Sequence, residues 1–141
     1  MASEILFLDS AGPRRWILKQ EGALSVAPDR AVFCASELLE AEVFRTLERM
    51  SLAYRWSDEQ TSQALHSAFL VVSRIQLVGL NSRVLKRVAG PLRGRLGTLD
   101  AIHFVTALIL REEGRGTLRF ATHDRELALA ARAEGFDVLG V

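Results

Sequence analysis

Five short apolar runs, separated by longer stretches with helical periodicity, most constrain the fold of this 141-residue chain. Consecutive apolar side chains in short runs are typical of strands buried on both faces, as in a parallel sheet that helices cover on each side. We therefore expect an α/β fold, a three-layer α/β/α sandwich around a central parallel sheet, formed as one domain over residues 1–141. The runs lie at 4–8, 31–35, 74–78, 118–121 and 136–139.

The segments between these runs carry helix start and stop signals. Ser36 is a candidate N-cap for a helix that runs to about Met50. Ser57, followed three residues later by Gln60, has the capping-box pattern and opens a helix toward Val72.

The second half of the chain predicts three more helices. Asn81 opens a helix to about Ala89, Thr98 caps a helix over 99–113, and either Thr122 or Asp124 caps the last helix. A further helix is expected between the first two strands, with Gly12 and Pro13 interrupting its start.

Composition excludes several classes of protein. Hydrophobic residues make up 49% and charged residues 25%, which is normal for a globular domain and argues against disorder. The single cysteine, Cys34, excludes an internal disulfide framework and fits a small core residue. The start of the chain has no basic segment typical of a signal peptide, and no apolar run reaches the ~20 residues of a membrane helix. We expect a cytoplasmic protein that does not contact a membrane.

The distribution of charge is uneven, although the net charge is only +1. No Asp or Glu occurs from Gln60 to Leu99. This stretch predicts either a basic face that holds phosphates or an ordinary solvated helix surface. The basic residues in it are Arg74, Arg83, Lys86, Arg87, Arg93 and Arg95.

Four acids occur where a parallel sheet gathers its functional groups. Asp9 follows the first strand, Asp124 follows the fourth, Asp100 lies in the first turn of a helix, and Glu42 lies in the second turn of another. Functional groups of open parallel sheets collect beyond the carboxyl ends of the strands. The fold would bring these acids to one edge, whereas taken singly each also fits a helix cap or a solvated acid.

Four carboxylates in one pocket repel one another, and a divalent cation removes that cost. An oxygen-only set without Cys or His ligands suits Mg²⁺ or Mn²⁺, which bridge carboxylates to substrate phosphates. The three histidines are not spaced as i,i+4 zinc ligands. The sequence therefore indicates metal-assisted phosphate chemistry.

Four segments of the chain together resemble a known family. The segments are ILFLDSA (5–11), SELLEAEV (36–43), LDAIHFVTA (99–107) and ATHDREL (121–127). In order, spacing and total length they resemble the motifs of PIN-domain ribonucleases, and within that family most of all the VapC-type toxins of toxin–antitoxin pairs.

The resemblance implies a Mg²⁺- or Mn²⁺-dependent endoribonuclease. Its catalytic and metal-binding acids would be Asp9, Glu42, Asp100 and Asp124. Ser10 and Thr122 match the hydroxyl positions beside the first and last acids and would hold ligands or waters in place. The partners implied are an RNA substrate, an antitoxin protein and a second copy of the chain in a homodimer.

One departure from the family pattern follows the first acid. Gly12-Pro13-Arg14-Arg15 stands where the family runs directly into an apolar helix. The insertion of two arginines alters the helix start or places positive charge near the substrate. Arginines near the site are candidate RNA contacts, namely Arg14, Arg15, Arg93 and Arg95.

Two other functions fit parts of the sequence. One is a catalytically silent module of the same fold that docks a protein or RNA partner. The other is a phosphorelay receiver, but the chain has only Lys19 and Lys86 and no adjacent acid pair after its first strand. Trp16, Tyr54 and Trp56 are candidates for stacking on RNA bases, or for filling the core or a dimer contact.

Overall fold

A five-stranded, all-parallel sheet forms the centre of the protein. The computed structural model describes residues 4–18, 31–92, 94–114 and 117–140. The strand order is β3-β2-β1-β4-β5, and every neighbouring pair runs parallel. The predicted α/β architecture is confirmed. The strands are β1 (Glu4–Leu8), β2 (Ala31–Ser36), β3 (Ile75–Val78), β4 (Leu118–Ala121) and β5 (Asp137–Leu139).

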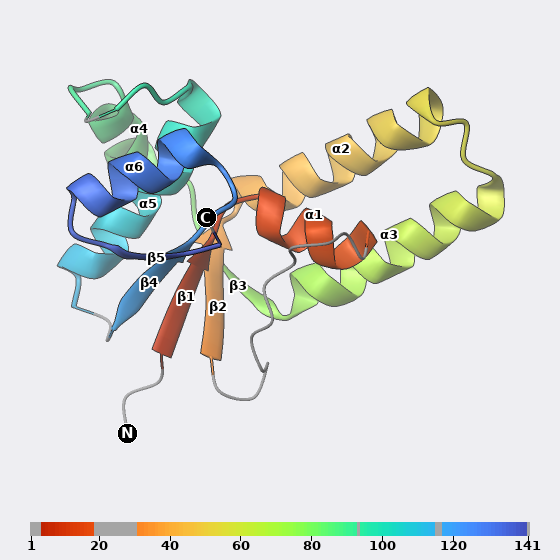
Figure 1. Cartoon of the computed structure of the whole chain (residues 1–141), viewed down its shortest axis with the longest axis horizontal. Helices are drawn as coiled ribbons and strands as arrows, with labels where there is room; N and C mark the ends of the chain where they lie inside the picture. Colours follow the sequence, from red (N-terminus) through yellow and green to blue (C-terminus); the bar gives the residue numbers. More distant parts are fainter. Residues whose placement is uncertain (1–3, 19–30, 93, 115–116, 141) are drawn as a thin grey trace.

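Six helices cover the two faces of the sheet. One group packs against one face, and α5 and α6 pack against the other, with α4 outside α5 (Figure 1). The first group is α1 (Ala11–Leu18), α2 (Leu38–Ala53) and α3 (Asp58–Ser73). The second is α4 (Ser82–Val88), α5 (Thr98–Glu112) and α6 (Arg125–Ala133).

The strands are apolar throughout because both of their faces are buried. Along β1, Leu6 and Leu8 face the α1–α3 side, whereas Phe7 faces α5 and α6. This alternation is the period of two expected for a strand. In the second layer Phe7 stacks on Phe120 with ring centroids 5.6 Å apart.

Helix α5 is buried on every side from Ala101 to Leu110. Phe104 and Leu108 pack toward the sheet, and Ile102 and Val105 pack toward α4. A helix that is apolar all round must lie inside the molecule, so α5 is a rigid support for the polar residues that it carries.

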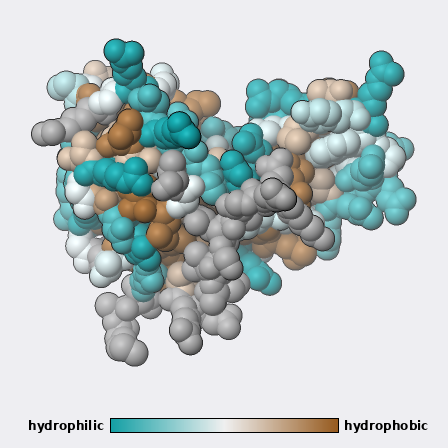
Figure 2. Space-filling model, viewed as in Figure 1, coloured by the Kyte–Doolittle hydropathy of each residue, from teal (hydrophilic) through white to brown (hydrophobic). Residues whose placement is uncertain are grey.

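Helices α2 and α3 form a hairpin that extends beyond the sheet as an arm (Figure 1). Phe44 and Phe69 join the two helices with ring centroids 4.9 Å apart. Hydrophilic side chains cover much of the end of this arm in the view of Figure 2. The arm and the α4–α6 group flank the region where the carboxyl ends of the strands meet the first turns of α1, α2 and α6 (Figure 1).

Two of the predicted caps are confirmed. Ser57 and Gln60 form the reciprocal capping box of α3, and the Asn81 side chain accepts a hydrogen bond from Val84 N at the start of α4. No helix in the described part of the chain is long and apolar enough to cross a membrane.

Two other predicted caps are wrong by one residue. Ser36 ends β2 and Glu37 is the N-cap of α2, although the Ser36 hydroxyl still accepts from Leu38 N at 3.2 Å. Thr98 is the first residue of α5, whose N-cap is Gly97. The residue at which helical dihedral angles begin need not be the residue whose side chain caps the helix. A single sequence does not show which of two neighbouring residues takes each role.

The interruption expected at Gly12 and Pro13 does not occur. Helix α1 begins at Ala11, before both residues, which lie buried in its first turn. Proline is tolerated there because a first-turn N–H has no partner inside the helix.

Candidate functional site

The topology creates one crevice at the carboxyl edge of the sheet. The chain moves from β1 to β2 and β3, then crosses back to β4 on the other side of β1. Connections therefore leave β1 and β4 in opposite directions, and ligands of open α/β sheets bind at such a switch point. Asp9 follows β1 and Thr122 follows β4 at this crevice.

Asp9 is a buried carboxylate, and only one of its two oxygens forms a hydrogen bond with a described side chain. Its side chain is 4% exposed, and Oδ2 accepts a hydrogen bond of 2.6 Å from Thr122 Oγ1. Oδ1 is buried and has no hydrogen-bond partner among the described residues. Burial raises the pKa of Asp9, although the Thr122 bond, His103 and the backbone N–H groups of Gly12 and Ala11 act to lower it.

Thr122 connects the first acid with the last. Besides donating to Asp9, its hydroxyl accepts from Asp124 N at 3.0 Å. Asp124 Oδ1 in turn accepts from Leu127 N at 2.9 Å, so Asp124 is the N-cap of α6. Of the two predicted caps for this helix, Asp124 is therefore correct. The Asp124 side chain is exposed.

The pKa of Asp100 is affected by all three of the other candidate acids. It lies in the first turn of α5 and is half-buried. Burial raises its pKa, and the negative charges of Asp124, Asp9 and Glu42 raise it further, against an opposing effect of His103. Four acids that are far apart in the sequence thus lie within electrostatic reach of one position.

Glu42 reaches this region from the arm. Its side chain is 20% exposed and Oε1 contacts His103 Nε2. His103 is wholly buried on α5, and its Nδ1 has no hydrogen-bond partner within the described segments. The contact joins α2 on one side of the sheet to α5 on the other. The sequence showed His103 only as one of three histidines that are not spaced as zinc ligands, and its pairing with Glu42 could not be found without the fold.

Gly140 fixes the position of Thr122. Its φ is +98°, and a Cβ at this position would lie 2.6 Å from Thr122 O. Thr122 N donates to Leu139 O, and His123 Nδ1 lies 2.8 Å from Gly140 O. A glycine with positive φ allows this close approach, and sequence reasoning did not identify it.

A hard cation near the four acids would meet only oxygen ligands from their side chains. All four offer oxygen ligands, and Asp9 Oδ1 is buried without a hydrogen bond to the described residues, although the backbone N–H groups of Gly12 and Ala11 act on the same carboxylate. Among the described residues, no group of three or more His, Cys, Asp or Glu side chains is arranged so that it could hold a metal ion. Mg²⁺ is usually held by one or two carboxylates, with water completing its shell. Asp9 and Asp100 fit that limited role.

The predicted arginine contacts are dispersed. Arg14 and Arg15 lie half-buried on α1, and Arg95 is exposed before α5. Arg93 lies outside the described residues. Ser10 follows Asp9, and its backbone carbonyl accepts from Arg14 N.

The stretch that has no Asp or Glu in its sequence has acidic side chains from another helix beside it in the fold. Arg87 forms two hydrogen bonds with the Glu112 carboxylate, each 2.7 Å long, and the Arg83 guanidinium lies 3.5 Å from the Glu113 carboxylate. Both partners come from the end of α5. These two arginines are therefore largely neutralised and do not form a free phosphate-binding face.

The aromatic and cysteine candidates divide between core and surface. Trp16 meets Phe33 edge-on at 5.3 Å, and Trp56 packs against the same cluster. Cys34 is buried in β2, as predicted. Tyr54 differs, since it is 70% exposed.

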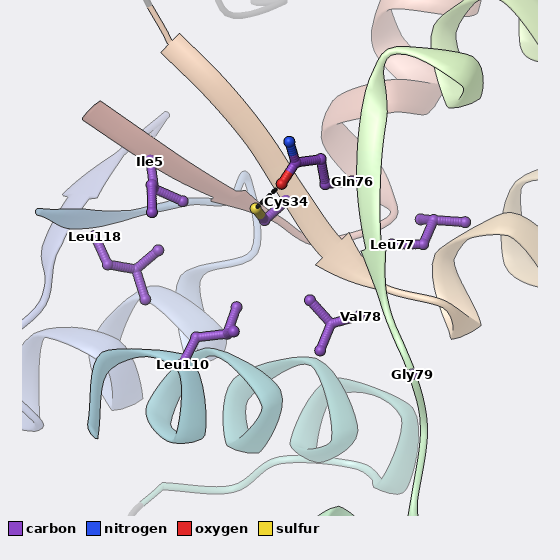
Figure 3. Close-up of a pocket in the computed structure, with 8 residues that line it drawn as sticks. All are labelled: Ile5, Cys34, Gln76, Leu77, Val78, Gly79, Leu110 and Leu118. Carbon is purple, nitrogen blue, oxygen red and sulfur yellow. Dashed lines mark hydrogen bonds between the residues drawn. The ribbon is translucent and has the colours of Figure 1, made fainter. Parts of the chain in front are cut away.

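A cavity of about 320 Å³ lies elsewhere, between the sheet and α5 (Figure 3). Ile5, Leu110, Leu118 and Val78 point into it, and Cys34 Sγ lies 4.0 Å from Gln76 Oε1 at its wall (Figure 3). Its lining contains no carboxylate, histidine, lysine or arginine. It therefore offers no general base or metal ligand, and the acids at the sheet edge are the better candidate for chemistry.

Comparison with known proteins assigns no family. No protein-family model matches the chain, and no curated protein is significantly similar to it. What stands is an α/β fold with a five-stranded parallel sheet of order 3-2-1-4-5.

Proposed function

We propose that this chain is a Mg²⁺- or Mn²⁺-dependent endoribonuclease of the PIN-domain type. The observation that supports it is the electrostatic coupling of Asp100 to Asp9, Asp124 and Glu42 at the switch point of the sheet. Like charges held close enough to shift a pKa are typical of functional sites.

The chain's own residues have separate tasks in this proposal. Asp9 and Asp100 would hold the ion directly, and Glu42 and Asp124 would hold it directly or through water. The Thr122 hydroxyl fixes the Asp9 carboxylate through Oδ2, and Oδ1 makes no hydrogen bond to the described residues. His103 holds Glu42. When bound, the ion supplies Lewis acidity, which lowers the pKa of a water and neutralises charge on the phosphate.

The test is cleavage of RNA by variants that remove one charge each. We expect Asp9→Asn and Asp100→Asn to lose cleavage of RNA in Mg²⁺ or Mn²⁺ by about 100-fold or more, because a direct ligand is lost. Glu40→Gln, an exposed acid two residues before Glu42, is the matched control and should cleave like the wild type. Undiminished cleavage by folded Asp9→Asn and Asp100→Asn proteins contradicts the proposal.

The silent-module alternative makes a different prediction for metal binding. A nuclease should bind Mn²⁺ in titration calorimetry, and Asp100→Asn should weaken that binding. A docking module needs no ion, so the absence of any Mn²⁺ binding heat together with inactive wild-type protein would favour it.

The resemblance to VapC-type toxins extends the proposal to partners. It predicts a homodimer and a small antitoxin, in the cytoplasm. The test is co-expression with the neighbouring reading frame. A stable complex that suppresses RNA cleavage supports the toxin assignment, and a free, unaffected nuclease contradicts it.

A further inference from the structure

A groove between α1 and α2 carries positive charge that no function has yet explained. Its volume is about 410 Å³. Arg14 and Leu18 of α1 form one wall, and Thr46, Arg49 and Met50 of α2 form the other, with Tyr54 at the outer end. Helix α1 lies alongside the sheet-proximal part of the arm (Figure 1).

One wall of the groove lies on the same face of α2 as the candidate acid Glu42. Glu42, Thr46, Arg49 and Ala53 are spaced by four, three and four residues, so they follow one another along a single face of α2. At 1.5 Å per residue, Arg49 lies about 10 Å along the helix from Glu42. On the opposite wall, α1 starts two residues after Asp9, and Arg14 N donates to Ser10 O in its first turn. A chain leaving the acids can therefore run outward along this groove.

The two arginines of the groove have no acidic partner among the residues that the structure describes. Other arginines have one, such as Arg45 with Glu48 at 2.8 Å on another face of α2. Neither Arg14 nor Arg49 forms an ion pair within the described residues. Arg49 Nη2 donates to Thr46 Oγ1 at 3.3 Å, which keeps the guanidinium over the stripe that begins at Glu42.

We propose that this groove binds the single-stranded RNA that flanks the cleaved phosphate. Arg14 and Arg49 pair with backbone phosphates, for which the guanidinium fork is well shaped. Tyr54, 70% exposed, stacks on a base farther along the strand. Two positive charges beside an aromatic platform fit a nucleic-acid strand better than an acidic peptide, which has no aromatic bases to stack on Tyr54. This inference rests on the proposed function for its choice of ligand.

The experiment measures binding without cleavage. Every protein carries Asp100→Asn, and a short fluorescent single-stranded RNA is titrated by anisotropy at several salt concentrations. We expect Arg14→Ala and Arg49→Ala each to weaken binding about tenfold and to reduce the salt dependence by about 0.7 in log–log slope, as for one lost phosphate contact. Tyr54→Ala should weaken binding about fivefold or more, with no change of slope.

Arg45→Ala is the matched control, because Arg45 lies four residues before Arg49 and is already paired with Glu48. It should bind like the parent protein. Thermal unfolding of each variant separates loss of binding from loss of fold. If Arg14→Ala alone unfolds, Arg49→Ala and Tyr54→Ala still decide the question.

Three results overturn the groove assignment. They are an absence of RNA binding by the parent protein, unchanged affinity and slope in Arg14→Ala and Arg49→Ala, or equal competition by a polyglutamate peptide. Failure of the nuclease proposal looks different, since the wild type then cleaves no RNA while the groove variants still lose affinity. Conversely, if the wild type cleaves RNA and the groove variants bind RNA as tightly as the parent protein, only the groove assignment fails.

Discussion

At the scale of single residues, the protein holds charges that cost it stability. The pKa of Asp100 is raised from its ordinary 3.8, first by burial and then by Asp124, Asp9 and Glu42. When the pKa of an acid is higher in the folded state than in the unfolded state, the native state is favoured by the protonated form of that acid and not by its ionised form. Its contribution to stability therefore falls as pH rises from about 4 through the raised value.

We predict that Asp100→Asn is more stable than the wild type at pH 7 without metal. The gain should be on the order of 1 kcal/mol or less, since Asp100 is partly exposed to water. It should vanish below the ordinary carboxyl pKa, where both proteins are neutral at this position. Urea unfolding from pH 3 to 8 measures the difference. Asp58→Asn, on the exposed first turn of α3, should show no gain, because its charge favours the helix dipole.

Thr122 offers a second prediction at this scale. Replacing it with valine keeps the shape but removes the donor to Asp9 and the acceptor for Asp124 N. We expect Thr122→Val to destabilise the protein by about 1–3 kcal/mol, because the buried Asp9 carboxylate and the partly buried Asp124 N–H lose their partner. Denaturant unfolding measures the cost.

Thr106→Val is the control for that experiment. Thr106 is equally buried, but its hydroxyl donates only to Ile102 O one turn earlier in the same helix. Its loss should cost roughly 1 kcal/mol or less. Equal costs for the two variants would mean that the Thr122–Asp9 bond has no special weight.

At the scale of elements, α6 combines a structural and a proposed catalytic role in one side chain. Asp124 caps the helix through Oδ1. Asparagine caps helices about as well as aspartate, whereas alanine loses about 1 kcal/mol. We predict that Asp124→Asn keeps the stability of the wild type but loses RNA cleavage, and that Asp124→Ala loses both. Thermal unfolding and cleavage assays on the same preparations check this. If Asp124→Asn cleaves like the wild type, Asp124 is only a cap.

The elements themselves were largely predictable from the sequence. All five strands lie within one residue of their predicted bounds, because short apolar runs between polar breaks have few other readings. Caps were less predictable: Asn81 and Ser57 are correct, while Ser36 and Thr98 each miss by one residue. At the start of a helix, side-chain hydrogen bonds to the backbone and the onset of helical dihedral angles compete to decide which residue is the cap. Neighbouring polar residues can take either role.

Contacts between elements were not predictable in the same way. The pairing of His103 with Glu42 joins two helices on opposite faces of the sheet, 61 positions apart. The neutralisation of Arg87 by Glu112 likewise joins α4 to the end of α5. Such pairs depend on how helices cross, which periodicity alone does not specify. That the residues after β1 and β4 lie at one edge of the sheet was predictable, because topology rather than packing detail brings strand ends together. The roles of the four acids stay predictions.

At the scale of the whole molecule, the candidate site lies between two helical groups. Glu42 comes from the arm, Asp9 from the central strand, and Asp100 and Asp124 from the helices of the opposite face. An ion held by these acids would connect both faces of the sheet at the edge where their charges repel. Metal binding should therefore stabilise the entire cooperative unit rather than a local loop.

We predict that Mn²⁺ at 100 times its dissociation constant stabilises the wild type by about 2.7 kcal/mol, which corresponds to roughly 5–10 °C in Tm. Scanning calorimetry with and without Mn²⁺ measures the shift. Glu42→Gln and Asp100→Asn should reduce it, whereas Glu40→Gln, exposed on the same arm, should retain it in full. Because the ion relieves repulsion, the variant that gains most stability without metal should gain least from adding it. A shift of equal size in all four proteins would mean that Mn²⁺ binds elsewhere.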